Sequence, residues 1–82
     1  MKEEIKQKVT SYVIDASFAE KEKIKDETLI FQEGFFDSMG FIMLLSFLEE
    51  TFEIKSLDTD LVEENFESIN AITNYIVSKK AA

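Results

Sequence analysis

The 82-residue sequence predicts a single all-α domain, residues 1–82, folded as a small bundle of three main helices and one short helix. Two observations support this fold class. The sequence has no proline and only two glycines, Gly34 and Gly40, so few positions interrupt a helix. Its apolar residues also recur at helical spacing in three separate segments, and 45% of all residues are hydrophobic, which is enough for a folded core.

The first helix is expected to begin at Glu3 and to end at residues 16–18, because its apolar residues recur on one helical face. That face holds Ile5, Val9, Tyr12, Val13 and Ala16. A long, charged connection follows over residues 19–37, and its apolar triplet at 29–31 indicates that it lies on the core. Gly34 is expected to form a turn with positive φ just before the second helix.

The second helix, from Ser38 to Thr51 or Phe52, is the most apolar segment, and Asp37 is a suitable N-cap residue. Its core face is expected to hold Phe41, Leu44, Leu45, Leu48 and Phe52. One face cannot also bury Ile42, Met43 and Phe47. Gly40 in the first turn costs about 1 kcal/mol relative to alanine, which indicates that something near the helix start needs the space.

The last third of the sequence predicts a short helix and a final long one. Asp58 or Thr59 is expected to cap the short helix, over residues 60–64. Ser68 is expected to cap the final helix, whose apolar residues share one face. These residues are Ile69, Ile72 and Ile76. Lys79 and Lys80 follow near its C-terminus, where the helix dipole favours positive charge.

Composition excludes several classes of function. Without cysteine or histidine, the chain has no disulfides, no thiolate metal ligands and no histidine general base, and it cannot form a hydrolytic triad. The run Asp58-Thr59-Asp60 fails the calcium-loop template, so no metal site is expected. A net charge of −8 disfavours nucleic acid and favours either a basic protein partner or simple solubility.

The expected location follows from what the sequence lacks. The longest apolar run, residues 41–45, is too short to cross a bilayer, so no membrane insertion is expected. The first residues lack the apolar core of a signal peptide. We therefore expect a cytoplasmic protein. We also expect a monomer, and the missing histidine and cysteine disfavour an enzyme.

One motif connects these features to a known family. The stretch G-F-F-D-S-M-G at residues 34–40 opens an apolar helix that ends L-E-E-T-F. An acidic short helix and the pattern S-I-x-A-I-x-x-Y-I at residues 68–76 follow. Over nearly its whole length the chain resembles the acyl carrier protein family, which includes peptidyl and D-alanyl carriers. The family's hallmark is D-S-L or D-S-M at the start of the second helix, and the resemblance implies an acyl-carrier-like fold.

The resemblance implies that Ser38 carries phosphopantetheine, attached covalently from coenzyme A, whose thiol holds an acyl or aminoacyl group as a thioester. The sequence agrees, because a chain without cysteine needs a borrowed thiol and a helix N-terminus favours a phosphodiester. Asp37 would cap the helix and lie near the metal-assisted transfer, and Met39 would anchor docking. The expected function is a free-standing carrier that delivers its cargo to partner enzymes.

The implied partners are a phosphopantetheinyl transferase, an acyl- or aminoacyl-loading ligase, and an acceptor transferase or synthase. Fatty-acid carriers place acidic residues along the exposed face of the second helix, whereas this chain has Gly40, Met43, Phe47 and Glu50 there. We expect these four residues to bind partners of a specialised pathway. Two alternatives remain: the loop or last helix buries Met43 and Phe47, or the protein is an acidic, non-enzymatic helical adaptor for a basic partner.

The cargo pocket is expected beside Phe41 and Phe66. Phe41 stands about one helical turn from Ser38, and Phe66 precedes the final helix, where the resembling carriers line the mouth of an acyl cavity. Two large rings there would fill the cavity and favour a short or polar cargo that stays in solvent. The alternative is that the rings complete the core and a cavity opens beneath them.

Overall fold

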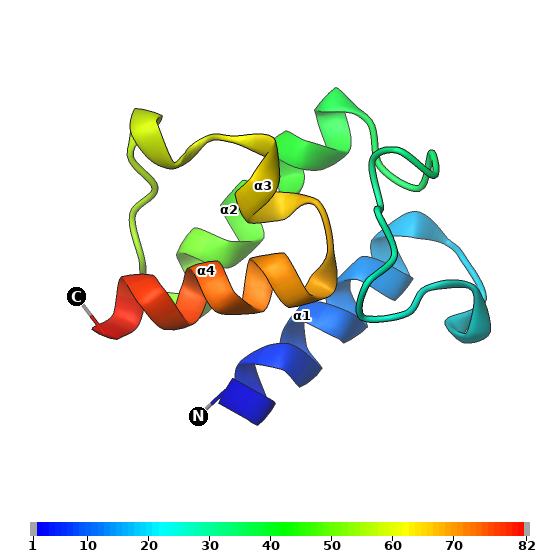
Figure 1. Cartoon of the computed structure of the whole chain (residues 1–82), viewed down its shortest axis with the longest axis horizontal. Coiled ribbons are helices and arrows are strands. Elements are labelled where there is room, and N and C mark those ends of the chain that lie inside the picture. The colour runs from blue at the N-terminus through cyan, green and yellow to red at the C-terminus, as the bar shows by residue number, and fades with distance from the viewer. Residues whose placement is uncertain (1, 82) are drawn as a thin grey trace.

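A computed structural model describes residues 2–81 and confirms the all-α fold class (Figure 1). The helices are α1 (Lys2–Ser17), α2 (Ser38–Phe52), α3 (Glu63–Phe66) and α4 (Ile69–Ala81). Two short 3-10 turns, η1 (Lys21–Lys23) and η2 (Asp58–Asp60), lie in the connections. Three long helices and one short helix agree with the predicted set. None of the described helices has the length and apolarity needed to cross a bilayer.

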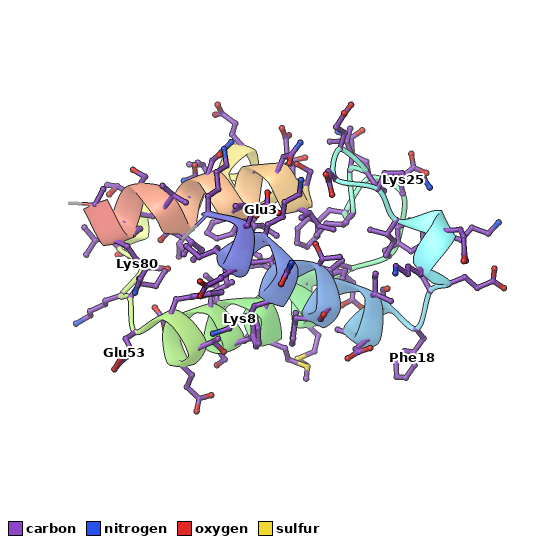
Figure 2. All side chains as sticks on the ribbon, turned by 90° about the horizontal axis from the view of Figure 1, so that it is seen from below. Glu3, Lys8, Phe18, Lys25, Glu53 and Lys80 are labelled. Carbon is purple, nitrogen blue, oxygen red and sulfur yellow. The ribbon has the colours of Figure 1, made fainter. Side chains whose placement is uncertain are left out.

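The core forms between α1, α2 and α4. α1 and α3 both pack against α4, and Figure 2 shows α1 in front with α4 above and α2 below it. The apolar faces predicted from the sequence point inward, except that Ala16 at the end of α1 is exposed. The buried hydrophobic residues of these three helices are Ile5, Val9, Val13, Leu44, Leu48, Phe52, Ile69, Ile72, Tyr75 and Ile76, and the polar residue Thr73 of α4 is buried with them. The predicted core positions Phe41 and Leu45 are half-buried at the edge of this core.

α1 ends in a turn that places the ring of Phe18 in solvent. Phe18 follows the helix with φ of 58°, and its side chain is 95% exposed. The Ser17 hydroxyl donates to the Ile14 carbonyl at 3.1 Å and accepts from the Ala19 N–H at 3.3 Å, which fixes the turn. Figure 2 shows Phe18 pointing away from the helices.

The termini of the long helices follow the sequence closely. Ser68 caps α4 as predicted, because its hydroxyl accepts the Ala71 N–H at 3.1 Å. α2 ends at Phe52, and Glu53 then takes a left-handed conformation with φ of 54°. Lys80 donates to the Phe52 carbonyl at 2.9 Å. The positive charge near the end of α4 therefore satisfies the end of α2.

The predicted position of the short helix is wrong. Residues 60–64 were expected to form it, whereas the chain makes η2 first and begins α3 only at Glu63. Neither Asp58 nor Thr59 caps α3, whose N-cap residue is Val62. The physical reason is that the Asp60 carboxylate accepts the Leu57 N–H at 3.0 Å and closes a separate turn, so the helix starts later.

Candidate functional site

The long connection between α1 and α2 is fixed to the core and holds Ser38 in place. Ile30 is fully buried, and its N–H donates to the Glu67 carbonyl at 2.9 Å. The Ile30 carbonyl accepts from the N–H groups of Phe35 and Phe36 at 2.9 and 3.1 Å. Gly34 lies between them with φ of 86°, which confirms the predicted turn. The segment just before α2 therefore has a defined path despite the length of the connection.

Asp37 and Gly40 shape the first turn of α2. The Asp37 carboxylate accepts the Gly40 N–H at 2.8 Å, which confirms Asp37 as the N-cap. A Cβ at position 40 would lie 3.1 Å from the buried Phe36 ring. The absence of a side chain at Gly40 therefore leaves space for the Phe36 ring. This explains why a glycine occupies a helical position where it is unfavourable. Ser38 is the first residue of the helix and is exposed, and its hydroxyl is not needed for the cap.

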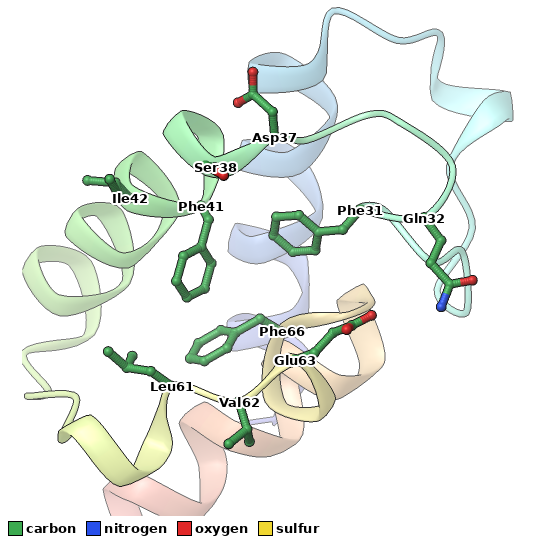
Figure 3. A pocket seen from close by; sticks show the side chains of 10 residues that line it. All are labelled: Phe31, Gln32, Asp37, Ser38, Phe41, Ile42, Leu61, Val62, Glu63 and Phe66. Atoms are coloured by element: carbon green, nitrogen blue, oxygen red, sulfur yellow. The ribbon is translucent and has the colours of Figure 1, made fainter.

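An open groove of about 650 Å³ lies directly beside Ser38. It runs between the start of α2, the preceding connection and the segment that enters α3 (Figure 3). The groove is lined by Phe31, Gln32, Asp37, Ser38, Phe41, Ile42, Leu61, Val62, Glu63 and Phe66. Figure 3 shows Phe41 directed into the groove and Asp37 directed away from it. The structure thus brings the predicted pair Phe41 and Phe66 to one site next to Ser38.

Three phenylalanine rings form the inner surface of the groove. Phe41 packs edge-to-face on Phe66, with centroids 5.2 Å apart, and on Phe31, at 5.9 Å. Phe66 is 1% exposed and continues the contact to Tyr75 at 5.0 Å. Such pairs contribute about 0.5–1.5 kcal/mol beyond their buried area. The rings therefore form a firm apolar floor.

The wall that carries Leu61 and Val62 is held by polar contacts around Asp60. The Asp60 carboxylate accepts from the Lys79 ammonium at 2.9 Å and from the Tyr75 hydroxyl at 3.2 Å. These contacts tie η2 to α4 across 15 and 19 residues of sequence.

Charge and burial shift the pKa values in this cluster. The Leu57 N–H, followed by Lys79, lowers the pKa of the Asp60 carboxyl. The hydrogen bond to Asp60 raises the pKa of Lys79. Burial raises the pKa of Tyr75. The folded structure therefore stabilises the ionised form of the Asp60 carboxyl group.

The outward face of α2 next to Ser38 is apolar. Met39, Ile42 and Met43 are each about 60% exposed, and Leu61 and Val62 adjoin them across the groove with exposed fractions of 41% and 43%. Met43 is thus exposed, as one of the two sequence interpretations required. An exposed cluster of this kind is typical of an interaction surface.

Phe47 and Gly40 do not belong to that exposed face. Phe47 is half-buried, and its ring stacks on Tyr12 of α1 with centroids 4.2 Å apart. The structure therefore favours the alternative in which Phe47 is covered within the domain. The covering element is α1, and not the loop or the last helix that the sequence suggested. Gly40 is explained by its internal contact with Phe36. Glu50 is exposed, three turns from Ser38 along the same helix.

Negative charge is concentrated in the half of the chain that forms the groove. Residues 27–67 contain eleven acidic residues and one basic residue, Lys55. Asp37 and Glu63 line the groove, and none of the described lining residues is basic. Among residues 2–81, no three acidic side chains gather as ligands for a metal ion. The site therefore combines an apolar interior with an acidic rim.

Comparisons with known proteins add no relative. A scan against protein-family models and a search of curated proteins find no match to this chain. Functional inference therefore depends on the site itself and on the motif resemblance.

Sequence reasoning missed several residues of the site. Phe31, Leu61 and Val62 line the groove but were not predicted to do so. The apolar triplet at 29–31 was a signal for Phe31, since the connection was expected to lie on the core. Asp60 gave no comparable signal, because its partners Tyr75 and Lys79 are distant in sequence.

Proposed function

We propose that the protein is a carrier that binds phosphopantetheine covalently through Ser38 and holds an acyl or aminoacyl group as a thioester. The observation that carries the proposal is the position of Ser38. Its side chain is exposed on the first residue of α2, and it lines the mouth of an apolar groove. The D-S-M motif and the family resemblance point to the same residue.

The residues around Ser38 fit such a group. The first N–H groups of a helix are unpaired within the helix, and the helix dipole favours an anion there, so a phosphodiester on Ser38 is stabilised. Asp37 already uses its carboxylate to accept the Gly40 N–H and is directed away from the groove (Figure 3). The apolar groove offers cover to an acyl group of suitable size and polarity.

In this proposal the bound group and the residues around Ser38 have separate roles. When bound, the group supplies the thiol that this cysteine-free chain lacks. Ser38 provides the attachment oxygen, and the helix N-terminus holds the phosphate. Phe31, Phe41 and Phe66 form the apolar surface beside it. Met39, Ile42 and Met43 offer an apolar surface to a phosphopantetheinyl transferase, a loading ligase and an acceptor enzyme.

Intact-mass measurement tests the attachment. The wild-type protein is incubated with coenzyme A, magnesium and a phosphopantetheinyl transferase, and one phosphopantetheine mass should be gained. Ser38→Ala should keep the fold and gain nothing, because the hydroxyl is exposed and is not part of the cap. Ser46→Ala is the matched control, since Ser46 is also an exposed serine of α2, and it should be modified like the wild type.

Two results would overturn the assignment. One is a mass gain on Ser38→Ala, which would place the modification elsewhere. The other is no mass gain on the wild type with transferases of differing specificity. The second result would favour the adaptor function, for which the exposed Met39, Ile42 and Met43 beside an acidic rim already provide a binding surface.

A further inference from the structure

Building on the proposed function, we propose that the groove beside Ser38 receives a compact aromatic acyl group without negative charge. A long linear acyl chain and an acyl group with a free carboxylate are both excluded from it. Three features carry this inference: the closed floor of the groove, the geometry of its rings and the charge of its rim.

The floor of the groove is closed by a buried ring. Phe66 is 1% exposed, and it is held between Phe41 on the groove side and Tyr75 on the α4 side. Leu44 and Ile72 are fully buried in the same core. A linear chain could enter between the helices only by displacing Phe66 and disturbing a packed core, which is costly. The cargo therefore stays in the open groove, where a long chain would leave most of its length in water.

The rings in the groove favour another ring. Phe41 makes interplanar angles of 72° with Phe31 and 75° with Phe66, and it remains only half-buried (Figure 3). Aromatic rings attract one another in this edge-to-face arrangement more strongly than an aliphatic chain of equal area does. Ile42, Leu61 and Val62 complete an apolar lining of compact dimensions. A planar aromatic cargo can therefore add a further edge-to-face contact to the rings of Phe31, Phe41 and Phe66.

The rim disfavours a second negative charge. Glu63 lines the groove, and Asp37 lies at its edge with its carboxylate directed away from the rings (Figure 3). Glu33 and Glu64 are exposed on the adjoining segments. None of the described lining residues can offer a positive partner. A carboxylated cargo would be repelled by each of these charges and would pair with none of them. Neutral cargo meets no such cost.

The test compares cargoes on the same protein. The transferase attaches phenylacetyl-, hexadecanoyl- and succinyl-phosphopantetheine from the matching coenzyme A thioesters, and intact mass confirms each loading. Each hydrolysis rate is divided by the rate of the same thioester on free pantetheine, which removes the intrinsic reactivity of the cargo. On this scale we expect the protein to protect the phenylacetyl thioester about two- to tenfold more than the succinyl thioester, and the phenylacetyl cargo to raise the melting temperature of the protein. Stronger protection of the hexadecanoyl thioester than of the phenylacetyl thioester, or equal protection of all three cargoes, would overturn the inference.

Variants locate the effect. Phe41→Leu keeps an apolar side chain but removes the central ring, so the advantage of the phenylacetyl cargo should fall toward that of a linear chain. Phe18→Ala removes an exposed ring outside the groove and should leave the advantage unchanged. An advantage that Phe41→Leu retains in full would contradict the role of the rings.

A second measurement separates this inference from the proposed function. Free phenylacetyl-pantetheine and succinyl-pantetheine are titrated into the unmodified protein, and NMR shifts of the phenylalanine rings are followed. Selective shifts of Phe31, Phe41 and Phe66 by the phenylacetyl compound support the groove preference even if Ser38 accepts no modification. Absence of such shifts, together with normal loading of Ser38, would reject the groove preference and leave the carrier function standing.

Discussion

The two irregular segments that flank the groove are held in opposite ways. The connection over residues 18–37 is fixed by apolar burial, chiefly of Ile24, Ile30 and Phe36. The connection over residues 53–62 buries no large apolar residue completely, and it is fixed by the hydrogen bonds and ion pair of Asp60. One groove therefore has a wall that depends on hydrophobic burial and another that depends on charge.

The stability of the two walls should therefore depend on pH in different ways. Hydrophobic burial is insensitive to pH, so the wall with Phe31 and the position of Ser38 persist as long as the core does. The wall with Leu61 and Val62 responds to the ionisation of one carboxyl group. Substitutions in the two segments should consequently differ in both size and pH dependence.

Ile30→Ala should have the largest effect. Ile30 is fully buried, and its truncation removes apolar contacts and leaves a cavity, at a cost of about 2–5 kcal/mol in the free energy of unfolding. Urea unfolding measures the loss. Leu29→Ala is the control, because Leu29 is only half-buried and should lose less. A cost of Ile30→Ala no larger than that of Leu29→Ala would show that burial does not fix this segment.

Asp60→Asn should have a smaller effect that depends on pH. The folded state lowers the pKa of Asp60 below its ordinary value of 3.8, so the ionised carboxylate contributes stability above that value. This contribution is lost as pH falls through the folded pKa. The variant should therefore melt below the wild type at neutral pH, and the difference should shrink as pH falls below 3.8 through the lowered pKa of Asp60.

Asp58→Asn provides the matched control for that prediction. Asp58 is an exposed acidic residue in the same 3-10 turn. The Asp58→Asn variant should therefore melt at the same temperature as the wild type. A gap between Asp60→Asn and the wild type that persists unchanged in acid would mean that the segment is held by something other than the charge of Asp60.

Met43→Ala should have the smallest effect on stability, because Met43 belongs to neither anchored segment and is 59% exposed. The free energy of unfolding should change by no more than about 0.5 kcal/mol. The rate of phosphopantetheine transfer to Ser38 should nevertheless fall, since the exposed apolar face loses contact area for the transferase. Unchanged transfer kinetics would remove Met43 from the docking surface.

Local patterns in the sequence predicted much of the fold. The bounds of α1, α2 and α4 followed from apolar periodicity, and the caps at Asp37 and Ser68 followed from residue type. Gly34 and the burial of the long connection were also predicted correctly. The helix bounds, the caps and the Gly34 turn depend on residues within a few positions of one another, and the burial of the connection was signalled by its local apolar triplet at 29–31.

The features that were missed depend on residues that are distant in the sequence. Phe47 stacks on Tyr12, which belongs to another helix, so the periodicity of α2 alone could not place it. α3 begins later than expected because Asp60 bonds to Leu57, Tyr75 and Lys79 instead of continuing a helix. Leu61 and Val62 were missed for the same reason. They line the groove because η2 packs against α4, and that contact joins residues that are distant in the sequence.

The pairing of α1 with α4 has a consequence for when the protein acquires its structure. The first helix finds its main partner in the last one, so Ile5, Val9 and Val13 stay uncovered while the chain is being synthesised (Figure 1). Ser38 leaves the ribosome long before Ile72 and the rest of α4 do. An enzyme that requires the complete fold would therefore act only after α4 has emerged from the ribosome and packed against α1.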